Sequence, residues 1–79
     1  MPSVLIVDDL PAVHELLDAV ISPAGFVSSF SLDAREALER YREEHFDVVL
    51  ADISMQPMDG LTLLKELKAY DRHAIVVIR

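Results

Sequence analysis

The sequence predicts an α/β domain in which a doubly wound parallel β-sheet carries helices on both faces. Two observations lead to this fold class. Short aliphatic runs at residues 4–7 and 48–51 have the composition of strands that are covered on both faces. Amphipathic segments with a helical period alternate with such runs, and the short connections imply right-handed crossovers. The expected order of elements is therefore βαβαβαβ, without an internal repeat.

The first strand is expected at residues 4–7, and a helix should follow it. Pro11 suits a first helical turn, and Pro23 with Gly25 marks the end of the helix. The apolar positions between them have the spacing i, i+3, i+4, i+7, i+8, which predicts one face directed at the sheet. The residues of this face are Val13, Leu16, Leu17, Val20 and Ile21.

The second strand, expected at residues 26–30, is more polar than the first, which favours a position at the edge of the sheet. The next helix should open at Asp33, because Glu36 stands three residues later and completes the pattern of a capping box. One apolar face is expected along this helix. Its members are Ala34, Ala37, Leu38, Tyr41 and His45.

The third strand is expected at residues 47–52, where an aliphatic run ends in a carboxylate. A loop with Pro57 leads to a third helix, and Asp59 with Gly60 is interpreted as the turn and cap that start it. A fourth strand is expected at residues 75–78. The third helix should direct one stripe inward, made of Leu63, Leu64, Leu67 and Tyr70.

Length and charge restrict the function classes. The 79 residues allow one domain at most, spanning 1–79. Fourteen acidic residues against seven basic ones give a net charge of −7, and the basic residues are scattered, which argues against nucleic acid or a membrane surface as a direct partner. No apolar run approaches the length of a membrane span, and cysteine is absent. We expect a cytoplasmic protein.

Three carboxylates fall where parallel sheets bind ligands, at the carboxyl ends of strands. Asp8 and Asp9 follow the first strand, and Asp52 ends the third. If these strands are neighbours, their ends lie about 5 Å apart. Clustered like charges either raise a pKa or recruit a cation, and oxygen ligands favour Mg²⁺, with Mn²⁺ as a substitute. In the alternative interpretation, each aspartate caps a helix or a turn.

Other metal sites find less support in the sequence. His14, His45 and His73 lack a common metal-ligand spacing, which favours surface or boundary positions for all three. The segment DISMQPMDG has aspartates and a glycine, as calcium-binding EF-hand loops do. Its glycine position and its ligand alternation are wrong for such a loop.

Two segments, VLIVDD at residues 4–9 and VVLADISMQPMDGLTLLKEL at residues 48–67, resemble the receiver domain of bacterial two-component response regulators. The resemblance extends over the whole chain but covers about two thirds of such a domain. It implies the flavodoxin-like, receiver-type form of the doubly wound sheet, with strand order 2-1-3-4-5. The fifth strand and the last two helices are absent from these 79 residues.

The resemblance also implies site roles. Asp52 would accept a phosphoryl group from a sensor histidine kinase or a phosphotransfer protein. Asp9 would bind Mg²⁺ directly, Asp8 mostly through water, and the backbone carbonyl of Ser54 would add a ligand. The phosphoaspartate would hydrolyse slowly, as in a phosphoacceptor rather than a dedicated turnover enzyme. The protein would act as a phosphorylation-controlled switch for a downstream effector domain, expected beyond Arg79.

The chain departs from the family pattern in two places. Gln56 stands where the family usually has proline, and Pro57 follows one place later, which affects the loop that carries the Ser54 carbonyl. The switch Ser or Thr falls at or just beyond Arg79, and the phosphate-binding Lys belongs to the absent fifth strand. Without the last elements, strand four becomes an apolar edge, so we expect self-association through strand four or the first helix.

Two other function classes remain open. A receiver-like module could serve protein–protein interaction alone, with a vestigial acidic site that is never phosphorylated. A Mg²⁺-dependent phosphatase with an aspartate nucleophile would need a second acid two residues after Asp52 to protonate the leaving group. Ser54 stands at that position instead.

Overall fold

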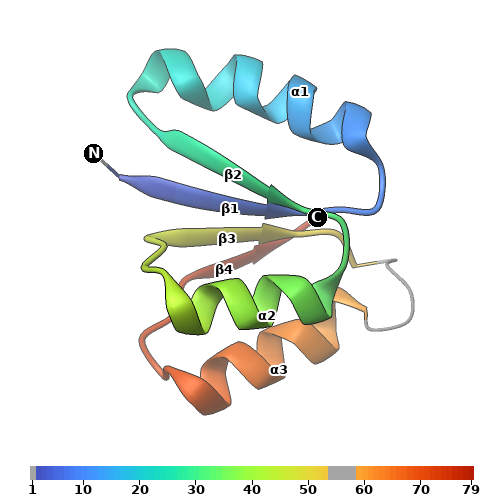
Figure 1. The fold of residues 1–79 in the computed structure, drawn as a ribbon, viewed down its shortest axis with the longest axis vertical. Helices are drawn as coiled ribbons and strands as arrows, with labels where there is room; N and C mark the ends of the chain where they lie inside the picture. The colour runs from blue at the N-terminus through green and yellow to red at the C-terminus, as the bar shows by residue number, and fades with distance from the viewer. Residues whose placement is uncertain (1, 54–58) are drawn as a thin grey trace.

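The computed structural model describes residues 2–53 and 59–79. In these residues, parallel strands form a four-stranded sheet in the order β2-β1-β3-β4, and Figure 1 shows α1 on one face with α2 and α3 on the other. The predicted fold class and element order are confirmed. The elements are β1 (Ser3–Val7), α1 (Pro11–Ile21), the 3₁₀ helix η1 (Ser22–Ala24), β2 (Val27–Ser31), α2 (Ala34–Glu43), β3 (Val48–Ala51), α3 (Gly60–Tyr70) and β4 (Val76–Ile78).

The core lies between the sheet and the layer made by α2 and α3. Alternate residues of the central strands point into it, among them Leu5, Val7 and Val49, which are almost completely buried. From the helices, Leu63 and Leu67 meet them with no exposed surface. The apolar stripe predicted for the third helix therefore forms at these two positions. Burial of this kind stabilises each leucine side chain by about 2 kcal/mol.

The packing of α1 is looser than its sequence pattern predicts. Leu16 is 69% exposed and Val20 is 71% exposed, and no residue of α1 is fully buried. The prediction that both face the sheet is therefore wrong. Figure 1 shows α1 on its face of the sheet without a neighbouring helix in the described residues. Val13, Leu17 and Ile21, on one side of the apolar stripe, are partly buried, whereas Leu16 and Val20 on its other side stay exposed. A shallow apolar cavity of about 160 Å³, lined by Val4, Ile21, Phe26, Val48 and Leu50, lies on this face.

Two residues assigned to buried helix faces lie elsewhere. The helix α2 ends at Glu43, so His45 falls beyond it, and its side chain is exposed. Tyr70 is exposed at the end of α3, although its ring packs edge-on against Tyr41 with a centroid distance of 6.3 Å. The periodic spacing of apolar residues continues past the end of the helix, so it assigns residues to a helical face that has already ended. The predicted strands differ from the observed ones by single residues at their ends.

Aspartates cap two of the helices. Asp33 Oδ1 accepts a hydrogen bond from the Glu36 backbone N–H at 2.8 Å, and Asp59 Oδ1 accepts one from Thr62 at the same distance. Both predicted helix starts are confirmed. The Glu36 carboxylate accepts a hydrogen bond from the hydroxyl of Ser31 at 3.2 Å, in place of the reciprocal bond of a capping box. Ser31 is buried, so its hydroxyl needs that partner.

Within the described residues, no helix combines the length and the apolar character needed to cross a bilayer.

The cap at Asp33 should contribute measurably to stability. Replacing it with Ala removes the acceptor for the Glu36 N–H, and we expect the free energy of unfolding to fall by about 1 kcal/mol. Urea denaturation measures this change. Asp33→Ser, which keeps a capping oxygen, is the matched control and should lose less. Equal losses in both variants would contradict the assigned role of the cap.

Candidate functional site

The structure brings Asp8, Asp9 and Asp52 together at the carboxyl ends of the two central strands. Strand β1 pairs in parallel with β3, and Val7 lies opposite Ala51. The Asp52 backbone N–H continues this ladder by donating to the Val7 carbonyl at 3.0 Å. One carboxylate oxygen from each of the three aspartates lies within 4.8 Å of the others. Such a cluster of oxygen atoms is suitable for a hard divalent cation.

The three carboxylates differ in exposure and in support. Asp8 is only 1% exposed, and its backbone N–H donates to the Ser31 carbonyl at 3.1 Å. Its Oδ1 accepts a hydrogen bond from the Leu10 N–H at 2.9 Å, which fixes the side chain. Asp52 is half-buried and Asp9 is exposed. The acidic cluster is therefore anchored at Asp8 and opens to solvent at Asp9.

A cation of the protein itself meets this cluster. Arg79, which follows β4, contacts Asp8 Oδ2 with its Nη2 at 2.5 Å. Two backbone hydrogen bonds hold Arg79 against the β3 side, from its N–H to the Ala51 carbonyl at 2.9 Å and from the Ile53 N–H to its carbonyl at 3.2 Å. Sequence reasoning gave Arg79 no role at the site. The available signal was that Arg79 follows a predicted strand, at the same end of the sheet as the aspartates. A local pattern does not show that its side chain reaches Asp8.

Gly60 has a role that the sequence did not reveal. A Cβ at this position would lie 2.6 Å from the Asp52 carbonyl oxygen and 3.1 Å from the Cα of Ile53. Real Cβ atoms do not approach backbone atoms so closely, so the first turn of α3 can pack against the Asp52 backbone only with glycine there. The Asp-Gly pair was interpreted as a turn and cap. The cap is at Asp59, and the glycine allows the close approach.

Several predicted residues fall away from the cluster or outside the described residues. Ser54, with the backbone carbonyl expected to bind the metal, lies outside them, as do Gln56 and Pro57. His14 stacks on Phe30 with a centroid distance of 4.7 Å. His45 and His73 are exposed and His14 is partly buried, so these side chains lie at the surface or at its boundary, as interpreted.

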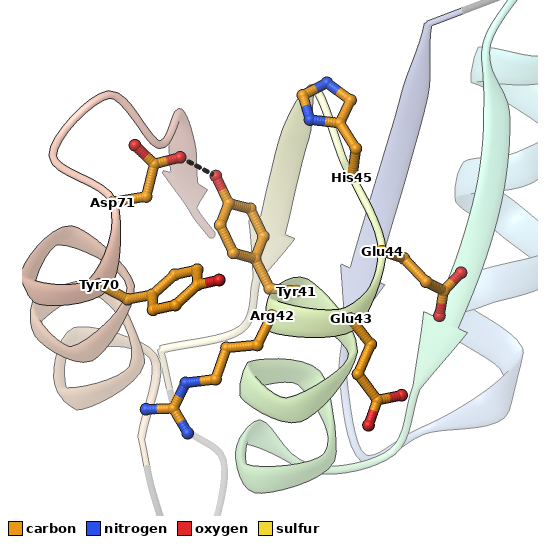
Figure 2. Close-up of a pocket in the computed structure, with 7 residues that line it drawn as sticks. All are labelled: Tyr41, Arg42, Glu43, Glu44, His45, Tyr70 and Asp71. Atoms are coloured by element: carbon orange, nitrogen blue, oxygen red, sulfur yellow. Dashed lines mark hydrogen bonds between the residues drawn. The ribbon is translucent and has the colours of Figure 1, made fainter.

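A cavity of about 340 Å³ lies at the amino ends of the strands, away from the acidic cluster, where α2 and α3 end (Figure 2). Figure 2 shows the hydroxyl of Tyr41 pointing at Asp71, and the oxygen atoms are 2.8 Å apart. The guanidinium of Arg42 lies 5.6 Å from the ring centroid of Tyr70. These contacts join the ends of the two helices, so we assign them a structural role. The lining residues are Tyr41, Arg42, Glu43, Glu44, His45, Tyr70 and Asp71.

The contact between Tyr41 and Asp71 shifts the titration of both groups. Burial, and then the hydrogen bond to the Asp71 carboxylate, raise the pKa of Tyr41 to about 12. The same hydrogen bond, assisted by one from the His73 N–H, lowers the pKa of Asp71. The contribution of Tyr41 to stability is complete below its ordinary pKa of 10.0 and disappears as the pH rises through 12. The contribution of Asp71 disappears as the pH falls below its ordinary value.

Absorbance titration of the phenolate tests this shift. In a Tyr70→Phe variant, Tyr41 is the remaining tyrosine, and we expect it to ionise near pH 12. Adding Asp71→Asn removes the charge, which should bring the pKa of Tyr41 down towards 10.0. Stability measured across this alkaline range should fall with rising pH in the parent and fall less steeply in Tyr41→Phe. Ionisation of Tyr41 at pH 10 in Tyr70→Phe would show that the contact does not hold in solution.

Replacing Gly60 with Ala should distort the site. The added methyl must push against the Asp52 backbone, so we expect a loss of about 1–3 kcal/mol in the free energy of unfolding. Amide chemical shifts of Asp52 and Ile53 should move with it. Thr62→Ala, in the same turn but exposed, should stay within about 0.5 kcal/mol of the parent. An unchanged stability for Gly60→Ala would mean that α3 does not pack as described.

Sequence comparison identifies relatives over almost the whole chain. The sequence profile described as "Response regulator receiver domain" matches residues 4–79. The chemotaxis protein CheY of Thermotoga maritima is 37% identical over 76 residues, which cover 95% of this chain and 63% of that protein. The transcriptional regulatory protein ZraR of Escherichia coli K12 is 39% identical over 75 residues, 95% of this chain but 17% of ZraR. The chain therefore spans less than two thirds of these relatives.

Solved structures agree with the sequence comparison. The response regulator TrrA of Thermotoga maritima, in complex with Mg²⁺-BeF, matches with a TM-score of 0.95 at 28% identity, covering 99% of this chain and 68% of that one. TrrA in complex with the histidine kinase ThkA matches with a TM-score of 0.93. CheY of Borrelia burgdorferi, in a CheX-CheY-BeF₃-Mg²⁺ complex, matches with a TM-score of 0.90 at 32% identity, covering 98% and 60%. The chain belongs to the response regulator receiver domain family.

Proposed function

We propose that residues 1–79 form part of a receiver domain in which Asp52 accepts a phosphoryl group from a sensor histidine kinase or a phosphotransfer protein. The reaction depends on Mg²⁺. The observation that carries this proposal is the convergence of Asp8, Asp9 and Asp52, each with a carboxylate oxygen within 4.8 Å of the others. The kinase complex known for TrrA supports the class of partner. The proposal places the protein in the cytoplasm.

The metal would be held by carboxylate oxygens and by one backbone oxygen. Asp9, the exposed member, would bind the ion directly, and Asp8 would bind it mostly through water. The Ser54 carbonyl, outside the described residues, would supply a further ligand. A ligand set made of oxygen atoms alone favours Mg²⁺, and Mn²⁺ would substitute for it. The bound ion offsets negative charge around the incoming phosphoryl group.

The surroundings of Asp52 support the proposal that it is the nucleophile. Its backbone is fixed by the hydrogen bond to Val7 and by the close approach of Gly60, while its side chain is half-buried. One of its oxygens would attack the phosphorus and form an acyl phosphate, while the bond between phosphorus and the donor imidazole nitrogen breaks. The freed imidazole nitrogen takes up a proton. The product hydrolyses slowly, which ends the signal.

The phosphorylated state would act on a downstream effector domain outside residues 1–79. In ZraR and in the regulatory protein AtoC of Escherichia coli K12, the matched segment is 17% and 16% of the protein, so most of each relative lies elsewhere. The net charge of −7 agrees with a receiver that leaves any contact with nucleic acid to another domain. Self-association through β4 or α1 stays a prediction.

One observation favours a second candidate, an interaction module with a vestigial acidic site. The ion pair between Arg79 and Asp8 already compensates one carboxylate of the cluster without a metal ion. A module of this kind would show no binding of Mg²⁺ at millimolar concentration. Calorimetric titration of the protein with Mg²⁺ separates the two candidates.

Phosphorylation at Asp52 is tested with the full-length protein that contains this segment. Incubated with Mg²⁺ and acetyl phosphate, it should gain one phosphate that is stable in acid and labile in base. We expect Asp52→Asn to reduce this incorporation to background, because an amide is not a nucleophile towards phosphorus. Intact-protein mass spectrometry measures the gain.

Asp59→Asn is the matched control, because Asp59 caps α3 outside the acidic cluster and asparagine caps helices equally well. This variant should be phosphorylated as the parent is. Incorporation that persists in Asp52→Asn, or that does not need a divalent cation, would refute the assignment.

A further inference from the structure

The contact between Arg79 and Asp8 crosses the site. In the sheet order, β3 lies between β1 and β4. Ala51 pairs with Ile78, so Asp52 and Arg79 are the next residues along neighbouring strands. From there the guanidinium reaches Asp8, which follows β1, at 2.5 Å. The side chain of Arg79 therefore spans the carboxyl end of β3, where Asp52 is located.

Asp8 depends on this contact for its charge balance. The side chain of Asp8 is 1% exposed, and a buried carboxylate is strongly destabilised unless hydrogen bonds or a cation compensate it. Its Oδ1 is engaged by the Leu10 N–H, and its Oδ2 by Arg79. The guanidinium thus occupies one of the two Asp8 oxygens that an ion, or a water bound to that ion, could use, and the other oxygen already accepts a hydrogen bond. Two cations at this oxygen would repel each other strongly at such short range.

We propose that Arg79 is a positioning residue that takes the place of the divalent cation at Asp8 and lowers the affinity of the acidic cluster for that ion. The inference rests on the proposed metal site and goes beyond it. When the ion enters, Arg79 leaves Asp8. Its side chain is 39% exposed, so solvent can receive the guanidinium. Ion binding and the contact between Arg79 and Asp8 therefore oppose each other: binding of the ion weakens the contact, and the contact weakens binding of the ion.

This linkage has a definite sign. Removing the charge of Arg79 removes both the competitor for Asp8 and the repulsion felt by the ion, so the metal should bind more tightly. The same change leaves Asp8 buried without a cation, so the metal-free protein should become less stable. Added Mg²⁺ should therefore raise the melting temperature of such a variant by more than it raises that of the parent.

The test measures Mg²⁺ and Mn²⁺ dissociation constants by calorimetry in the full-length protein. We expect Arg79→Gln to bind both ions about tenfold more tightly than the parent, because the ion no longer has to displace a charged side chain from Asp8. Arg79→Lys, which keeps the charge, should stay close to the parent. Arg72→Gln removes an equal charge from an exposed position before β4 and should leave the constants unchanged.

An unchanged or weaker affinity in Arg79→Gln, with the parent binding Mg²⁺, would overturn this inference and leave the proposed function standing. Absence of Mg²⁺ binding in the parent and in every variant would instead overturn the proposed function, and the inference with it. A second measurement does not depend on the folding of the variants. In the parent, the Nε–H resonance of Arg79 should move during Mg²⁺ titration with the same dissociation constant as the Asp9 amide, and a resonance that stays in place at saturation would overturn the inference.

Discussion

The pairing of β1 with β3 is the contact on which the rest of the structure depends. These strands are separated by β2 along the chain, but they lie side by side at the centre of the sheet. Their inward residues build the core with α2 and α3, and their carboxyl ends bring Asp8 and Asp9 to Asp52. Stability and chemistry are therefore coupled here. A change that shifted the register of this strand pair would at once disturb the core and move the carboxylates apart.

The acidic cluster could be predicted because its causes are local. Two aliphatic runs that each end in aspartate indicate buried parallel strands, and parallel strands place their carboxyl ends at one edge. No comparable local signal exists for the contact of Arg79 with Asp8, which joins residues 71 positions apart. The requirement at Gly60 depends on how α3 approaches the backbone of Asp52. Both are long-range contacts, and a linear pattern does not contain their distances.

Helix α1 shows a second limit of periodicity. Its apolar spacing is regular, and a stripe from Val13 to Ile21 follows from it, but burial also requires a partner for each part of the stripe. In the described residues one side of this stripe, with Leu17, is partly buried, and the other side, with Leu16 and Val20, is exposed. Amphipathicity thus predicts which residues can be buried. How many of them are buried depends on the elements that share the same face of the sheet.

Helix α3 runs from the carboxyl ends of the strands towards their amino ends. Its first residue, Gly60, touches the Asp52 backbone, and immediately after its last turn Asp71 is tied to Tyr41 of α2. A helix of 11 residues is about 16 Å long and behaves as a rigid rod over that length. A movement of the Asp52 backbone would therefore meet α3 at Gly60, its first residue, whereas the hydrogen bond between Tyr41 and Asp71 restrains the other end of the helix. With these contacts, a displacement of α3 would be larger beside the acidic cluster than beside Tyr41.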